Sequence, residues 1–196
     1  MRKKSHILLA GYLADQLSAA ESLQAHRKAF CLGNILPDIK PSFLTTRHEY
    51  FTTIGTVQDR IRFLVEDGFH ECNDRVFWRR IGEVIHYIAD YFTFPHNKTF
   101  QGTFRQHNSY EKELKNKLKT YIKSGQAQDD LGNRSMFRFG SISELMEYVR
   151  VRHQSYLCKE RCVAEDIQYI LTVCMQVVYG IFHLCTEVST AELAVA

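Results

Sequence analysis

Apolar residues recur every three or four positions through most of the chain, and short polar stretches interrupt the pattern. This period predicts amphipathic helices. Ser5 is the expected N-cap of the first helix, because a serine side chain can accept a hydrogen bond from the free N–H groups of a first turn. The predicted helices cover residues 5–23, 25–32, 57–67, 73–94, 107–123, 141–156 and 160–186.

The connectors between these helices are of two kinds. Residues 33–42 and 95–104 carry Pro and Gly, which disfavour regular structure. Residues 124–140 are rich in turn formers and are the expected mobile surface loop. The last helix, by contrast, is apolar on all sides, which is typical of a central core helix. We therefore expect an all-α, multi-helix bundle formed as a single domain by residues 1–196.

Composition narrows the class of protein further. The 25 basic and 22 acidic residues are interspersed, so the net charge of +3 indicates a mildly basic surface without a nucleic-acid stripe. Six cysteines without a CxxC pair suit reduced thiols, and we expect a cytoplasmic protein. The start resembles a signal peptide, but its apolar run is short and Asp15 and Gln16 follow it. No stretch reads as a transmembrane segment of roughly 20 apolar residues.

One stretch, residues 85–111, is dense in possible metal ligands: "IHYIADYFTFPHNKTFQGTFRQHNSYE". His86 and Asp90 lie four residues apart in one predicted helix, and His107 and Glu111 lie four apart at the start of the next. Residues four apart share a helix face, so each pair can approach one cation. His96 lies in the connector between the two helices and can turn toward either pair. The stretch therefore predicts a metal cluster.

A histidine and a carboxylate four residues apart are common by chance, and a single such pair usually lies on a solvated helix face. The joint occurrence of two pairs and His96 favours a metal. The segment "LPDIKPSFLTTRH" adds Asp38 and His48. Imidazole and carboxylate donors without thiolate indicate zinc in a catalytic site rather than a structural one.

These features together resemble the zinc-dependent phospholipase C family, which is structurally akin to the zinc-dependent single-strand nucleases. The resemblance rests on His6 ahead of an apolar helix, on "LGNILPD" with a histidine ten residues later, and on "HYIADYFTFPHN" and "HNSYE", which together span about the first 115 residues. It implies a first zinc held by Asp38, His48, His86 and Asp90, and a second held by His96, His107 and Glu111. Asp90 would also bridge to a third zinc completed by His6.

The same resemblance implies a phosphoester hydrolase in which a metal-activated water attacks phosphorus and Asp38 orients or deprotonates that water. The substrate would be a phosphoester such as a phospholipid. Two alternatives stay open: a nuclease or nucleotide phosphohydrolase on the same scaffold, and a non-catalytic, metal-stabilised binding module. In secreted relatives the processed N-terminus also holds the third metal, whereas here Met1 and "RKKS" precede His6 and no processed amine is evident.

Two further groups of residues allow more than one interpretation. Phe92, Phe94, Phe100 and Phe104 either line an apolar substrate cleft or belong to the core. The basic residues near the ligand segment either attract a polyanionic substrate or form a solvated helix face; they are Arg79, Arg80, Lys112, Lys115, Lys117 and Lys119.

Overall fold

A computed structural model describes residues 1–17, 21–40, 48–68, 71–131 and 135–195. Every regular element in these ranges is a helix, which confirms the predicted all-α class. The elements are α1 (Lys3–Gln16), α2 (Glu21–Ala25), α3 (Arg27–Gly33), η1 (Leu36–Asp38), α4 (Tyr50–Phe63), η3 (Leu64–Gly68), α6 (Asp74–Tyr91), η4 (Phe94–His96), α7 (Phe104–Lys123), α8 (Gln126–Leu131), α9 (Ile142–Leu157) and α10 (Val163–Val195).

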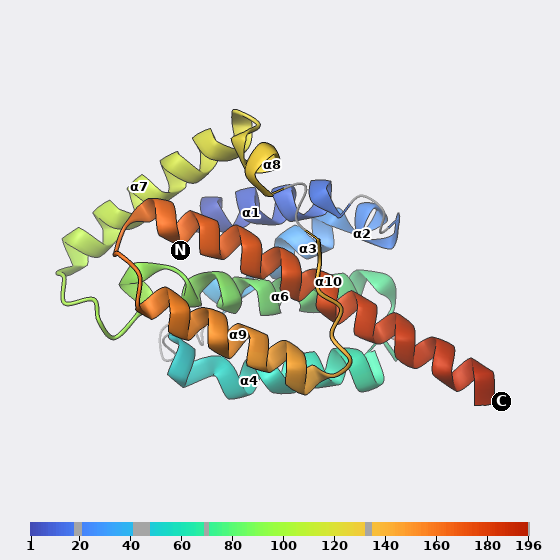
Figure 1. Cartoon of the computed structure of the whole chain (residues 1–196). Coiled ribbons are helices and arrows are strands. Elements are labelled where there is room, and N and C mark those ends of the chain that lie inside the picture. The colour runs from blue at the N-terminus through green and yellow to red at the C-terminus, as the bar shows by residue number, and fades with distance from the viewer. Residues whose placement is uncertain (18–20, 41–47, 69–70, 132–134, 196) are drawn as a thin grey trace.

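The apolar last helix, α10, runs across the bundle and packs against α9, α6 and α7, and its final turns extend beyond the other helices (Figure 1). By length and composition its segment Val163–Glu187 could cross a membrane. However, 67% of the apolar window in that segment is buried inside the protein, as expected of a core helix. α10 therefore serves as the predicted central helix.

The helix that carries His86 and Asp90, α6, lies at the centre of the bundle (Figure 1). Asn73 caps it by accepting a 3.0 Å hydrogen bond from the Val76 N–H. From Ile81 to Tyr91 every residue is buried, so this half of α6 has no solvent-facing side. A histidine and an aspartate in such a segment are removed from water and need polar partners.

Helices α3 and α6 cross closely at two glycines, one on each helix, and this contact sets their relative position. A Cβ on Gly33 would lie 2.0 Å from the Arg79 carbonyl oxygen, and one on Gly82 would lie 2.3 Å from the Phe30 carbonyl oxygen. Only glycine permits this backbone-to-backbone approach. The crossing brings Asn34 and the turn η1 next to the half of α6 that carries His86.

The beginning of the chain departs from the predicted boundaries. α1 starts at Lys3, where Arg2 is the N-cap, and ends at Gln16 rather than near residue 23. Ser5 is therefore not an N-cap. Its N–H already donates to the Arg2 carbonyl oxygen at 2.8 Å, and its hydroxyl is buried inside the helix.

Three later boundaries also differ from the prediction. α4 begins at Tyr50 rather than Val57, because the Thr53 hydroxyl lies 2.8 Å from the Tyr91 hydroxyl and this contact offsets the low helix propensity of threonine. The predicted loop 124–140 contains α8, whose Ala127 carbonyl accepts a hydrogen bond from Tyr12. α10 continues past residue 186 to Val195.

Candidate metal centre

The buried pair on α6, His86 and Asp90, forms the core of the candidate site. The His86 Nδ1 lies 2.8 Å from the Asn34 carbonyl oxygen. Since a carbonyl only accepts, Nδ1 must carry the proton, and Nε2 is left with its lone pair directed toward the cluster. The glycine crossing of α3 and α6 therefore orients a ligand-type nitrogen, as outer-shell carbonyls do in metal sites.

Side chains from three separate segments surround His86. The His48 Nδ1 lies 2.9 Å from the His86 Nε2, and the Asp38 Oδ1 lies 3.6 Å from it. The His6 ring, from α1, stacks on the His86 ring with 3.9 Å between centroids. Residues far apart in the chain thus converge on one face of α6.

The second pair, on α7, meets the histidine of the connector. The His96 and His107 Nε2 atoms each lie 3.2 Å from the Glu111 Oε1. A capping box at Thr103 and Gln106 starts α7 one turn before His107, and Pro95 fixes the short turn η4 that presents His96. These local features hold all three donors together.

Asp90 connects the two halves of the cluster. Its Oδ2 lies 3.2 Å from the His48 Nδ1, and its Oδ1 lies 3.4 Å from the His6 Nε2. The same Oδ2 also lies 3.6 Å from the His96 Nδ1. Among the described side chains, Asp90 therefore contacts imidazoles from both groups, whereas the bridge that the resemblance implies, from the first zinc to a third completed by His6, stays a prediction.

Sequence reasoning did not place the Met1 α-amino group in the site. This buried amine pairs with the Asp90 carboxylate and lies 2.9 Å from the His96 Nε2 and 3.3 Å from the Glu111 Oε1. Because α1 begins at Lys3, the chain start lies one turn from His6. Two signals were available: the short distance in sequence between Met1 and His6, and the role of the N-terminus as a metal ligand in secreted relatives.

Burial and neighbouring charges set the protonation of the cluster. Burial alone would raise the pKa of Asp90, but His96, the Met1 amine and His86 lower it well below its usual range. Burial would also raise the pKa of Glu111, but hydrogen bonds from His107 and His96 outweigh it and lower that pKa. Burial, followed by the nearby His6, lowers the pKa of His86. Ionised carboxylates and neutral imidazole are the forms that bind a metal.

The pKa values of the Met1 amine and of Asp38 are raised rather than lowered. Burial opposes the charge of the amine, but the Asp90 and Glu111 carboxylates outweigh it and raise the pKa of Met1. Burial and the nearby Asp90 raise the pKa of Asp38. Asp38 is therefore the carboxyl in the cluster that holds a proton most readily.

The donor set fits zinc. The structure offers three groups whose donor atoms lie within 4.8 Å of one another: His6, Asp38 and His86; His48, His86 and Asp90; and His96, His107 and Glu111. Both ring nitrogens of His6 are buried without a hydrogen-bond partner, although burial of an unpartnered polar atom is costly. A cation at this position would satisfy one of them, and imidazole with carboxylate is the donor chemistry of catalytic zinc.

The cluster forms the floor of an open cavity of about 700 Å³, a size typical of ligand sites. Asp38, His96, His107 and Glu111 line this cavity together with Met1. The other four ligand-type residues do not line it and are buried; they are His6, His48, His86 and Asp90. A ligand in the cavity would therefore meet one exposed edge of the cluster.

A buried aspartate on α10, Asp166, positions segments that carry donors of the second group. Asp166 accepts hydrogen bonds from the Phe94 N–H and from the Tyr110 hydroxyl, both at 2.9 Å. Phe94 precedes His96 by two residues, and Tyr110 is adjacent to Glu111. The other carboxylate oxygen accepts a 2.7 Å bond from the Tyr156 hydroxyl of α9. Asp166 thus ties the segments of two ligand-type residues to the core helix.

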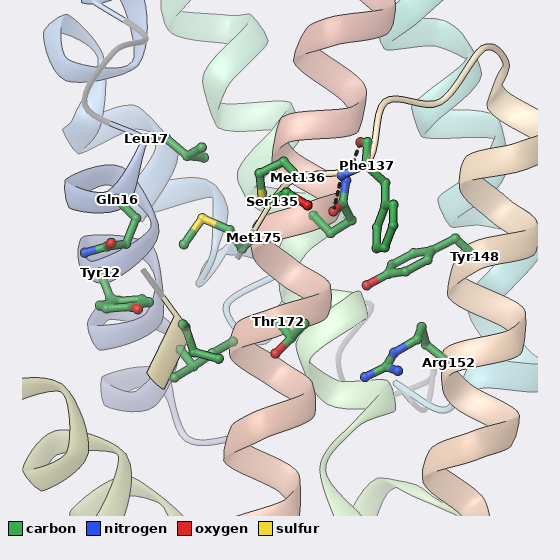
Figure 2. Close-up of a pocket in the computed structure, with 13 residues that line it drawn as sticks. Tyr12, Gln16, Leu17, Ser135, Met136, Phe137, Tyr148, Arg152, Thr172 and Met175 are labelled. Carbon is green, nitrogen blue, oxygen red and sulfur yellow. Dashed lines mark hydrogen bonds between the residues drawn. The ribbon is translucent and has the colours of Figure 1, made fainter. Parts of the chain in front are cut away.

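A second cavity, of about 450 Å³, lies between α1, α9 and α10 and contains none of the cluster residues (Figure 2). The Gln176 side chain closes one wall by bonding both the N–H and the carbonyl of Phe137. Arg152 is the one charged side chain among its lining residues. Without ligand-type side chains this cavity offers no comparable chemistry.

The remaining histidines and phenylalanines have other surroundings. His153 stacks on Tyr50 and lies 3.1 Å from the Asn97 side-chain oxygen, whereas His70 lies outside the described residues. Phe92 is fully buried core, but Phe104 lines the metal-centre cavity and is 82% exposed. The aromatic residues near the ligands therefore divide between the two predicted roles.

Comparison with known proteins agrees with this geometry. A family model described as zinc dependent phospholipase C matches residues 5–163, which include all eight ligand-type residues. Neither the curated proteins nor the solved structures contain a match to the chain.

Proposed function

Because the chain belongs to the zinc-dependent phospholipase C family, we propose that it is a zinc-dependent phosphoester hydrolase that acts on a phospholipid. The observation that carries the proposal is the convergence of eight imidazole and carboxylate side chains in one cluster, four of which line a single cavity. Zinc bound there would lower the pKa of water to about 7 and neutralise charge on phosphoryl oxygens. The side chains of the protein would hold the zinc, orient the water and accept its proton.

The two groups of donors would have distinct tasks. His48, His86 and Asp90 lie behind the cavity floor and would hold a zinc ion away from solvent. His96, His107 and Glu111 would hold another ion, with an edge open to the cavity. His6, through Asp90, would complete a third site. Asp90, whose carboxylate contacts His6, His48 and His96, would contribute to more than one of these sites.

Asp38 is the residue best placed to handle the proton of the reaction. Unlike Asp90 it lines the cavity, and its Oδ1 is within 3.9 Å of both His48 and His86. Burial raises the pKa of its carboxyl, and a general base is most effective when its pKa approaches the working pH. We propose that Asp38 orients the attacking water and accepts its proton.

The proposal is tested by metal content and turnover measured on the same protein. Chain purified without chelator should contain zinc and should hydrolyse phosphatidylcholine or a model phosphodiester. Asp90→Asn should lower zinc content and turnover together, whereas Asp38→Asn should lower turnover by more than it lowers zinc content. Helicity by circular dichroism serves as the folding control. A folded wild-type chain with less than about one zinc would refute the proposal.

The substrate panel separates the alternatives. Cleavage of single-stranded nucleic acid or nucleotides in preference to lipid would favour a nuclease or nucleotide phosphohydrolase on the same site. Zinc binding without turnover on any phosphoester, with unfolding after chelation, would favour a non-catalytic module. We also propose a cytoplasmic location, because all six cysteines are unpaired.

A further inference from the structure

Four basic side chains surround the mouth of the metal-centre cavity. Three of them lie at the start of α1, namely Arg2, Lys3 and Lys4, and the fourth, Lys115, lies on α7. The Arg2 guanidinium donates a 2.8 Å hydrogen bond to the Asn108 carbonyl, which holds it against α7. We call these four residues the basic rim. Two segments distant in sequence therefore place positive charge at one opening.

The charge of the basic rim is not neutralised by neighbouring acids. Arg2, Lys3, Lys4 and Lys115 take part in no ion pair between described side chains, whereas Arg27, Lys40 and Lys117 each pair with a carboxylate. The acids that line the cavity are Asp38 and Glu111, and both belong to the cluster. The lining of the cavity therefore carries four Lys or Arg side chains against two carboxylates.

Apolar side chains accompany this charge at the surface. Phe104 lines the same cavity and is 82% exposed. Ile7 lies four residues after Lys3, hence on the same face of α1, and is 46% exposed. Exposed aromatic and aliphatic residues beside lysines suit the boundary between lipid headgroups and acyl chains. A soluble polyanion would recognise the charge but would gain nothing from an exposed Ile7.

We propose that the basic rim, with Phe104 and Ile7, docks the chain on an anionic phospholipid surface and directs its activity to lipids there. Binding to the lipid surface does not depend on the proposed function, whereas the choice of substrate rests on the proposed phosphoester hydrolysis. A zwitterionic surface has no net negative charge to balance the four rim cations.

The direct test is sedimentation of the zinc-loaded chain with lipid vesicles. Vesicles that contain phosphatidylglycerol should bind the protein, and vesicles of phosphatidylcholine alone should bind it much less. Added salt should weaken the binding, because it screens exposed charges. The triple substitution K3Q/K4Q/K115Q should reduce partition to the anionic vesicles by about 100-fold. Phe104→Ala should weaken it further at constant charge.

A matched triple variant controls for the loss of charge itself. Lys28, Lys123 and Lys159 are exposed and do not line the cavity, so K28Q/K123Q/K159Q should bind the same vesicles like the wild type. Equal wild-type binding to both vesicle types, or equal losses in the two triple variants, would overturn the proposal. Binding of single-stranded polynucleotide through the rim lysines, without vesicle binding, would also overturn it.

Turnover distinguishes this proposal from the proposed function. If anionic vesicles bind through the rim but no phosphoester is cleaved, the hydrolase proposal fails and the docking surface remains. If both vesicle types are hydrolysed equally and rim variants change neither binding nor rate, docking fails and the hydrolase proposal remains.

Discussion

Asp166 provides the most demanding test of how the core supports the site. Its side chain is almost fully buried, with the residue 1% exposed, and it accepts bonds from Phe94, Tyr110 and Tyr156. Asp166→Ala removes the acceptor oxygens of all three bonds. Each buried donor left unpaired costs about 1–3 kcal/mol. Because Phe94 and Tyr110 adjoin His96 and Glu111, we expect zinc affinity at the second group to fall about 10-fold.

Asp166→Asn separates hydrogen bonding from charge. Its amide oxygen can accept from the Phe94 N–H and the Tyr110 hydroxyl, and its amide nitrogen can donate to the Tyr156 hydroxyl. We therefore expect near-normal zinc affinity. Burial raises the pKa of Asp166 to about 6 from 3.8, even though its three hydrogen bonds and the nearby Arg161 favour the ionised form.

That shift predicts a change in the pH dependence of stability. The folded chain binds the Asp166 proton more tightly than the unfolded chain does, so this contribution is complete below pH 3.8 and is lost as the pH rises through about 6. The shift corresponds to about 3 kcal/mol between the two limits. Asp166→Asn should remove this amount from the pH dependence of unfolding by urea in the metal-free protein.

The zinc affinity itself is measured by competition with a chelator of known affinity. Tyr156→Phe is the matched control, because the Tyr156 hydroxyl bonds Oδ1 of Asp166, whereas Oδ2 accepts both bonds from the ligand segments. It should lower stability by about 1 kcal/mol and leave zinc affinity unchanged. Wild-type zinc affinity in Asp166→Ala, or an equal loss in Tyr156→Phe, would refute the positioning role.

Three other predictions follow from the site and the helix crossing. His107→Gln should lower zinc content by about one ion per chain while the first group stays loaded, as measured by elemental analysis; full loading would contradict its role as a ligand. Chelation should lower the thermal unfolding temperature, because free zinc at about 1,000 times its dissociation constant stabilises the folded chain by about 4 kcal/mol; an unchanged calorimetric transition would exclude such binding. Gly82→Ala should destabilise the chain by about 1–3 kcal/mol or more in urea unfolding, because its methyl group would lie 2.3 Å from the Phe30 carbonyl oxygen. Gly55→Ala is the control, because a Cβ at Gly55 would have no atom within 4 Å, and it should stabilise α4 by up to about 1 kcal/mol. Similar effects of the two substitutions on stability would contradict the close contact of α3 with α6 at Gly82.

Most of the helices could be predicted because helix formation depends on local periodicity and capping. The prediction failed where a distant contact outweighed local propensity. The first turns of α4 contain two adjacent threonines, and the contact from Thr53 to Tyr91 is made 38 residues away. α8 lay within a stretch of turn-forming residues, and its bond to Tyr12 spans 115 residues. Propensity carries no information about partners at such separations.

The ligand-type residues show the same division. His86 with Asp90, and His107 with Glu111, could be paired from spacing alone, since residues four apart on a helix are neighbours whatever the fold. The concentration of ligand-type residues added Asp38 and His48, and the resemblance to a family added His6; the roles of all three as ligands stay predictions. Spacing could not show which donors share a cation, nor that Asp90 faces both groups.

Long-range packing determined the rest of the site. Gly33 and Gly82 allow two backbones to touch, and this contact presents the Asn34 carbonyl to His86 and brings Asp38 into the cluster. Docking of α1 inserts His6 and the Met1 amine, and α10 supplies Asp166 from beyond the segment that carries every ligand motif. Helices and ligand pairs arise from interactions within one or two turns. A site assembled from segments far apart in the sequence depends on side-chain packing that no local pattern encodes.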